Sequence, residues 1–178
     1  ETDVWTLFHS YSFDWTVFEL WGALAFGGRL VVVPGMVAKL PDEFRDLVQA
    51  EGVTVLCQTP SAFRSFIQAD SEVGDARYAL RYVIFGGEAL EPQRLSAWMH
   101  RHPGSPRMIN MYGITETTVH ASFREITGGD IETNSSPIGV PLRHLAFFVL
   151  DRWLRPAPAG VVGELYVAGG ALASGYLG

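Results

Sequence analysis

The sequence predicts an α/β fold in which a parallel sheet with crossover helices is followed by a more antiparallel β region. Over about residues 16–118, short apolar runs alternate with amphipathic helical segments, the pattern of parallel strands joined by right-handed crossovers. After residue 118, strand-like segments follow one another with turns but without clear helices between them, which favours antiparallel pairing. The 178 residues, of which 48% are hydrophobic, suffice for a folded core.

The elements of the first region can be placed in order along the chain. Apolar residues recur at helical spacing over residues 16–25, and a second helix is expected from Pro41, because proline suits the first turn of a helix. Further helices are expected over residues 61–69 and from Pro92. The strands expected between these helices lie at residues 30–33, 53–56, 82–85 and 108–111.

The second region is expected to be mainly β, so that the chain divides into an α/β part at 1–118 and a β part at 119–178. Its strand-like segments lie at residues 121–126, 146–150 and 164–167. The first residue is Glu rather than Met, and the last residues stop abruptly after a patterned segment. We interpret the chain as an internal piece of a longer protein.

Composition argues against several classes of function. The net charge is −6 and no stretch concentrates Lys or Arg, so a nucleic-acid partner is not expected. The apolar runs are far shorter than the roughly 18 residues that span a bilayer, so no membrane partner is expected. The single cysteine, Cys57, fits a reducing, cytoplasmic location. The motifs of Rossmann oxidoreductases, of serine hydrolases with a Gly-x-Ser-x-Gly elbow and of His-Glu-x-x-His zinc enzymes do not occur.

Three segments should meet at one edge of the sheet, because ligands of open α/β sheets gather beyond the carboxyl ends of the strands. These are residues 57–59, 86–88 and 110–113. The last one continues through a glycine turn to the hydroxyl of Thr115 and the carboxylate of Glu116. An amide beside a tyrosine ring suits a nucleobase, a hydroxyl suits a phosphate oxygen, and a carboxylate suits Mg²⁺. A plain strand and turn, with Thr115 as a helix cap, would produce the same pattern.

Residues 110–117 resemble the motif Asn-x-Tyr-Gly-Pro-Thr-Glu of adenylate-forming enzymes, specifically the amino-acid adenylation domains of nonribosomal peptide synthetases. Ile114 stands where proline is usual. Residues 8–19 resemble the family segment Phe-Asp-x-Ser-x-Trp-Glu, with Thr16 and Phe18 as the departures.

A third segment, residues 163–177, resembles Gly-Glu-Leu-x-x-x-Gly followed by Ala-Arg-Gly-Tyr, with Ser174 in place of arginine. The turn at residues 86–89 and the stretch 58–61 are also typical of the family. The joint match of ordered motifs along nearly the whole chain is highly specific.

The resemblance implies a role for each matching residue. The residues implied to hold the nucleotide are Gly86, Gly87, Glu88, Asn110, Tyr112 and Thr115. The implied catalytic residues are His9, Thr115 and Glu116. Of these, Glu116 should bind Mg²⁺, and His9 takes the place of an aromatic gate near the reacting carboxylate. A half-buried, hydrogen-bonded imidazole is the structural alternative for His9.

Asp14 is implied to pair with the α-ammonium group of the amino acid. Its carboxylate precedes an apolar helix and faces a largely apolar pocket, where a cation that completes the pairing gains most. The alternative is a helix N-cap. The side chains implied to line the pocket are Trp15, Phe18, Cys57, Ile84, Gly86, Met111, Val119 and His120. This set is similar to the family's threonine-selecting pocket except at its first three members, so a small neutral, threonine-like substrate is expected.

The implied reaction joins the amino-acid carboxylate to the α-phosphate of ATP and releases pyrophosphate. The aminoacyl group would then pass to the phosphopantetheine thiol of a peptidyl carrier domain, with a condensation domain as a further partner in the same synthetase. The family's phosphate loop and its C-terminal domain with the catalytic lysine do not occur in this sequence. We therefore expect the parent protein to be an amino-acid adenylating ligase and this fragment alone to be inactive.

Two alternatives stay open. The first is an acyl- or aryl-CoA ligase, against which Asp14 argues, because such substrates carry no ammonium group. The second is a non-catalytic module that binds a nucleotide or an amino acid.

Overall fold

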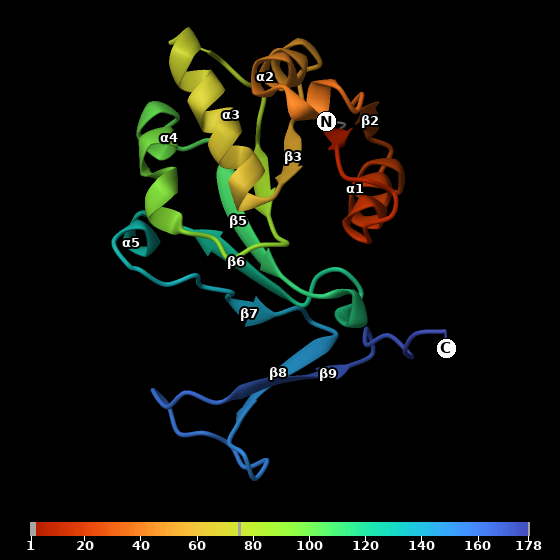
Figure 1. Ribbon diagram of the computed structural model, residues 1–178, viewed down its shortest axis with the longest axis vertical. Coiled ribbons are helices and arrows are strands. Elements are labelled where there is room, and N and C mark those ends of the chain that lie inside the picture. Colours follow the sequence, from red (N-terminus) through yellow and green to blue (C-terminus); the bar gives the residue numbers. More distant parts are fainter. Residues whose placement is uncertain (1–2, 75, 178) are drawn as a thin grey trace.

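A computed structural model describes residues 3–74 and 76–177. Within them, seven strands form one sheet in the order β2-β1-β3-β4-β5-β6-β7, and β8 and β9 form a second sheet (Figure 1). Pairing is parallel from β2 to β5 and antiparallel between β5, β6 and β7 and between β8 and β9. The predicted α/β fold, with a mostly parallel sheet followed by antiparallel strands, is confirmed.

The strands and helices have the following bounds. The strands are β1 Val4–Leu7, β2 Arg29–Val32, β3 Val55–Gln58, β4 Tyr82–Phe85, β5 Arg107–Tyr112, β6 Ser122–Ile126, β7 Val140–Pro141, β8 Leu145–Leu150 and β9 Glu164–Gly169. The α-helices are α1 Trp15–Leu24, α2 Pro41–Ala50, α3 Pro60–Val73, α4 Ser96–Arg101 and α5 Gly128–Ile131. Single 3₁₀ turns lie at Val37–Lys39, Pro92–Leu95 and Thr115–Thr117.

Several details differ from the sequence-based expectations. The strand expected at 53–56 is displaced to β3, because the amide of Val53 donates to the carbonyl oxygen of Val48 and closes the turn after α2. The helix expected from Pro92 begins as a 3₁₀ turn, and the short helix α5 was not expected. Strands β6 and β7 extend the large sheet, so the separate antiparallel sheet begins only at β8.

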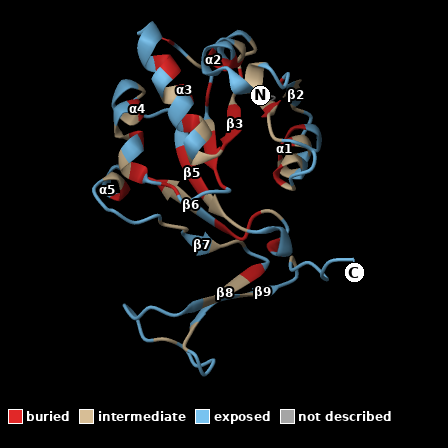
Figure 2. Cartoon of the chain, in the orientation of Figure 1, coloured by how far each residue is buried: buried red, intermediate tan, exposed pale blue. Residues whose placement is uncertain are grey.

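Both faces of the central strands are covered. Side chains alternate along a strand, so Leu56 of β3 belongs to the larger core cluster under α2 and α3, whereas its neighbours Val55 and Cys57 belong to a second cluster. Trp15 and Phe18 of α1 pack in this second cluster, so α1 covers the opposite face. Figure 2 shows buried residues along β3 and β5 and on the inward sides of α2, α3 and α4.

The β8–β9 hairpin extends away from the large sheet and is mostly exposed (Figures 1 and 2). Among the described helices, none has both the length and the apolar character that a membrane span requires.

Candidate active site

Two adjoining hollows lie where the chain leaves the carboxyl ends of β4 and β5. The first, here called the Asp14 hollow, has a volume of about 280 Å³ and is lined by Phe13, Asp14, Trp15, Gly87, Met111, Gly113, Ile114, Thr115, Glu116, Val119 and His120. The second, here called the Asn110 hollow, has a volume of about 380 Å³ and is lined by Gly87, Glu88, Ala89, Asn110, Met111, Tyr112, Gly113, Ile114, Ser136 and Ile138. The two share residues of the turns after β4 and β5, as the parallel arrangement of these strands requires.

Asp14 presents an unpaired carboxylate oxygen to the first hollow. It precedes α1, but its side chain makes no capping hydrogen bond, so the helix-cap alternative lacks the contact it needs. Its Oδ2 atom is buried and has no hydrogen-bond partner among the described residues. A buried carboxylate without a partner is costly, so this oxygen favours a cationic ligand.

Other buried polar atoms in or near this hollow also lack a partner. Within the described residues, seven buried side-chain nitrogen or oxygen atoms lack a partner, and four of them belong to His9, Asp14, Trp15 and His120. The imidazole of His9 stacks on the indole of Trp15 with ring centres 4.3 Å apart, and His120 meets Trp15 edge-on at 5.7 Å. Because buried polar groups are normally satisfied, the unpartnered atoms of Asp14 and His120, which both line the Asp14 hollow, indicate a site for a polar ligand.

His120 is held in its neutral form. It is only 7% exposed, and burial lowers its pKa from 6.5 to about 4, although the nearby charge of Asp14 raises the pKa in part. A neutral imidazole does not compete with a ligand cation for Asp14. It can also accept or donate a hydrogen bond through its unpartnered Nε2 atom.

Four of the eight implied pocket residues line the Asp14 hollow: Trp15, Met111, Val119 and His120. The other four, Phe18, Cys57, Ile84 and Gly86, do not line either hollow. Phe18, Cys57 and Ile84 pack in the core cluster with Trp15, and burial raises the pKa of the Cys57 thiol. A Cβ atom on Gly86 would lie 3.2 Å from the Trp15 indole. Trp15, Met111 and Val119 are the members of this cluster that line the hollow.

The turn that carries Val119 and His120 has a strained backbone. Thr118 and Val119 have φ angles of 56° and 72°, and the His120 amide donates to the Thr118 carbonyl oxygen at 3.0 Å. A γ-turn around a β-branched residue with positive φ is costly and is typical of functional sites. Gly113 permits this turn, because a Cβ atom there would lie 2.2 Å from the Val119 carbonyl oxygen.

Of the six residues implied to hold the nucleotide, Gly87, Glu88, Asn110 and Tyr112 line the Asn110 hollow, Thr115 lines the Asp14 hollow, and Gly86 lines neither. The amide group of the buried Asn110 donates to the Pro137 carbonyl oxygen at 2.8 Å and fixes the loop opposite. The Glu88 carboxylate accepts hydrogen bonds from the amide and hydroxyl of Ser61, at 3.1 and 2.7 Å. It therefore ties this turn to the first residues of α3.

Thr115 and Glu116 form an exposed turn at the rim of the Asp14 hollow. Thr115 does not act as a helix cap; the amide of Ile114 instead donates to the hydroxyl of Thr117 at 3.0 Å. The Glu116 carboxylate accepts a hydrogen bond from the Tyr176 hydroxyl at 3.2 Å, which raises the pKa of that tyrosine.

No group of three potential metal ligands occurs within residues 3–74 and 76–177. The accessible Glu116 carboxylate nevertheless fits Mg²⁺, because this ion is commonly held by one or two carboxylates together with substrate phosphates.

Residues 1–177 match the family model described as "AMP-binding enzyme". The chain belongs to the AMP-binding enzyme family. The chain is 56% identical to a "Dimodular nonribosomal peptide synthase" of Bacillus subtilis (strain 168), over 99% of the chain and 8% of that protein. It is 46% identical to "Syringomycin synthase SyrB1" of Pseudomonas syringae pv. syringae, over 98% of the chain and 29% of that protein.

Solved structures agree with the sequence relatives. A crystal structure of the nonribosomal peptide synthetase FmoA3 superposes with a TM-score of 0.90 at 30% identity, over 99% of the chain and 19% of that protein. Holo-PA1221 is described as an NRPS protein containing adenylation and PCP domains bound to a vinylsulfonamide inhibitor. It superposes with a TM-score of 0.85 at 28% identity, over 98% of the chain and 30% of that protein. The predicted relationship to synthetase adenylation domains is confirmed, and the chain spans less than a third of these four proteins.

Some residues that line the two hollows were not predicted from the sequence. Phe13 and Ile114 line the Asp14 hollow, and Ala89, Ser136 and Ile138 line the Asn110 hollow. Phe13 and Ile114 lie inside the recognised motifs, so their proximity to assigned residues was the available signal. Ser136 and Ile138 belong to a turn-rich stretch that carries no comparable signal.

Proposed function

We propose that the protein containing this chain activates an amino acid with ATP, forming an aminoacyl-adenylate and pyrophosphate for nonribosomal peptide synthesis. The observation that carries the proposal is the buried, unpaired Oδ2 of Asp14 in a hollow that adjoins a second one next to the family's adenine motif. An α-ammonium group on Asp14 would complete the missing pairing. The substrate carboxylate would then extend toward the turns that the two hollows share.

Catalysis in this arrangement rests on alignment and charge stabilisation, with no covalent nucleophile from the protein. Asp14 binds the ammonium group, and the turns at Gly87 and Gly113 orient the two reactants. Thr115 contacts the phosphates at the rim. Mg²⁺, when bound, neutralises charge on the phosphates, and Glu116 is the residue that would hold it.

The hollow supports a small neutral amino acid, with threonine as the leading substrate. Trp15 lines the hollow, whereas Cys57 and Ile84 of the same core cluster do not, and its bulky indole limits the length of a substrate side chain. His120 is neutral, so the second charged side chain that lines the hollow is Glu116 at its rim, which is proposed to hold Mg²⁺ and not the substrate side chain. The unpartnered Nε2 of His120 suits a hydroxyl donor.

In the longer protein, the peptidyl carrier domain with its phosphopantetheine and the condensation domain are the proposed partners. The relatives are synthetases, and one structural neighbour is described as containing adenylation and PCP domains. Inactivity of the isolated fragment, cytoplasmic location and the lack of a nucleic-acid partner stay predictions.

ATP–pyrophosphate exchange tests the proposal. The full-length protein is assayed with each proteinogenic amino acid and with carboxylic acids of matched shape that lack the amine. Exchange with one small neutral amino acid is expected. Preference for a charged or large aromatic amino acid would contradict the proposed substrate, and exchange only with amine-free acids would indicate an acyl ligase. Nucleotide binding without exchange would indicate a non-catalytic module.

A further inference from the structure

Residues 171–176, which follow β9, lie against the turn that follows β5 (Figure 1). The hydroxyl of Thr118 donates to the carbonyl oxygen of Ala171 at 2.5 Å. The amide of Ala173 donates to the carbonyl oxygen of Glu116 at 2.8 Å. The turn is thus tied, through its side chain at Thr118 and its backbone at Glu116, to a segment 53 residues further along the chain.

Thr118 stands directly before two residues of the wall of the Asp14 hollow. It lines neither hollow itself, whereas Val119 and His120 both line the Asp14 hollow. The His120 amide donates to the Thr118 carbonyl oxygen at 3.0 Å, so the backbone of Thr118 fixes the start of this wall. Asp14, which holds the unpartnered carboxylate oxygen of the same hollow, comes from a different segment, directly before α1.

The backbone at Thr118 is held in a conformation that threonine seldom adopts. Thr118 and Val119 have φ angles of 56° and 72°. Such angles are costly for β-branched residues and persist only where the surrounding structure enforces them. Glycine would adopt them freely, so what threonine adds at this position is its hydroxyl and the bond to Ala171.

We propose that Thr118 is a positioning residue for the side chain of the amino acid, and that it acts through Val119 and His120. Its hydroxyl, bound to Ala171, keeps the strained turn in the conformation that places these two residues in the wall of the Asp14 hollow. The proposal rests on the proposed function, in which this hollow receives the amino acid. Without the hydroxyl the turn relaxes and the wall that faces the substrate side chain shifts, whereas Asp14 keeps its place.

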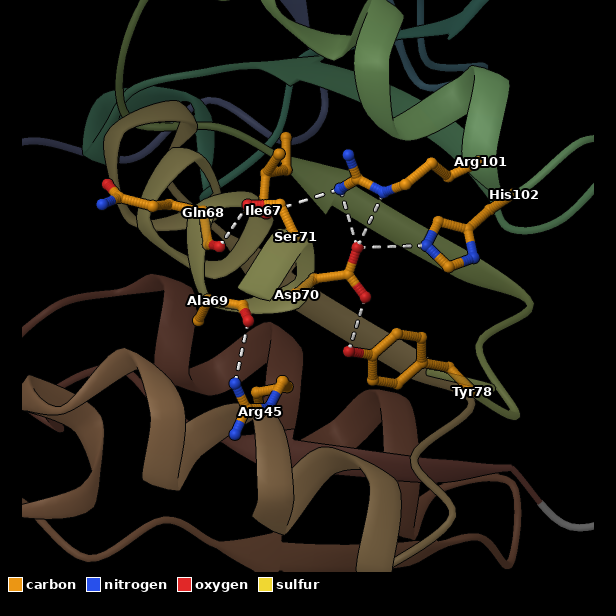
Figure 3. Close-up of polar contacts among 9 residues, drawn as sticks. All are labelled: Arg45, Ile67, Gln68, Ala69, Asp70, Ser71, Tyr78, Arg101 and His102. Atoms are coloured by element: carbon orange, nitrogen blue, oxygen red, sulfur yellow. Dashed lines mark hydrogen bonds and ion pairs between the residues drawn. The ribbon is translucent and has the colours of Figure 1, made fainter. Parts of the chain in front are cut away.

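Tyr78 shows what a purely structural hydroxyl looks like in this chain. It donates to the buried carboxylate of Asp70 at 2.9 Å, and Asp70 also binds Arg101 at 2.7 Å and His102 at 3.3 Å (Figure 3). These contacts join α3 to the end of α4. None of the four residues lines the Asp14 or the Asn110 hollow, so loss of this hydroxyl should affect stability alone.

ATP–pyrophosphate exchange in the full-length protein tests the role with Thr118→Val, which removes the hydroxyl but keeps the shape of the side chain. KM for the active amino acid should rise by about 10-fold, because the bond that holds the turn is lost, and KM for ATP should change by less than about twofold. Discrimination against a homologue with one extra methylene, about 10- to 200-fold in a well-formed pocket, should fall by about 10-fold. The preference for the α-amine over a hydroxyl analogue should persist, because Asp14 is unchanged.

Two further substitutions at Thr118 separate the hydroxyl from folding. Thr118→Ser keeps the hydroxyl and should restore KM and side-chain discrimination to within about twofold of the wild type. Thr118→Gly removes both the hydroxyl and the strain, so its melting temperature should equal or exceed that of Thr118→Val, while its KM for the amino acid should rise at least as far. The glycine variant also replaces the valine variant if the latter does not fold.

Tyr78→Phe is the matched control, since it also deletes one hydroxyl hydrogen bond. It should lower the melting temperature and leave KM for the amino acid and side-chain discrimination unchanged; an equal rise in KM would overturn the proposal. Unchanged KM and discrimination in folded Thr118→Val or Thr118→Gly would overturn it, as would an equal defect in Thr118→Ser or loss of the amine preference together with the discrimination. Failure of the wild type to exchange with any amino acid would instead overturn the proposed function.

Discussion

Acidification should destabilise the protein through His120. In the folded protein the pKa of this residue lies near 4, against 6.5 for an unperturbed histidine, because burial disfavours the charged ring. Between these values the unfolded chain binds more protons than the folded protein does. The contribution of neutral His120 is therefore complete above pH 6.5 and is lost as the pH falls toward 4. This contribution to the free energy of unfolding is about 3 kcal/mol in total, of which about 2 kcal/mol is already lost at pH 5.

The assay is urea unfolding at pH 7.5 and pH 5 for the wild type and His120→Gln. Glutamine keeps a polar side chain but does not titrate, so the variant removes the contribution of His120 while all other groups titrate as before. The wild type should lose about 2 kcal/mol more free energy of unfolding between the two pH values than the variant. Equal losses in the two proteins would refute the argument that His120 is buried in its neutral form.

Three other substitutions have expected outcomes. Gly113→Ala should lower the free energy of unfolding by about 1–3 kcal/mol and reduce exchange activity, because the added Cβ would lie 2.2 Å from the Val119 carbonyl oxygen; unchanged activity in a folded variant would contradict this. Glu88→Ala should cost about 1 kcal/mol in urea unfolding, since α3 loses the acceptor for the Ser61 amide; an increase in KM for ATP without loss of stability would indicate direct nucleotide contact instead. Tyr78→Phe should cost about 1 kcal/mol, because the hydroxyl donates to buried Asp70, and a stability equal to the wild type would show that this bond adds nothing.

The order of helices and parallel strands was predictable because each buried strand is a short apolar run between two amphipathic segments. Strand β1, Val4–Leu7, was not predicted from the sequence, because four residues that include a threonine are too short to show a strand pattern. Its place in the sheet comes from pairing with β2 and β3, which are distant in sequence.

Within the site, the sequence indicated which segments meet but not which side chains reach the hollow. Trp15 lines the hollow, whereas Cys57 and Ile84 pack in the same core cluster without lining it, an outcome that depends on side-chain packing. A glutamate on a helix is expected at the surface, so the burial of Glu19 was not predictable from its residue type. The positive φ angles at Thr118 and Val119 are equally unexpected, because β-branched residues rarely adopt them.

The pairing of Asp14 with a substrate ammonium group is tested most directly by comparing two substrates in two proteins. ATP–pyrophosphate exchange is measured for wild type and Asp14→Asn with the active amino acid and with its analogue in which a hydroxyl replaces the α-amino group. We expect the wild type to prefer the amine by about 100-fold or more in kcat/KM, since an unpaired buried charge costs about 3–5 kcal/mol, and Asp14→Asn to lose most of this preference. An equal preference for the amine in both proteins would contradict the assignment of Asp14 as the ammonium-binding residue.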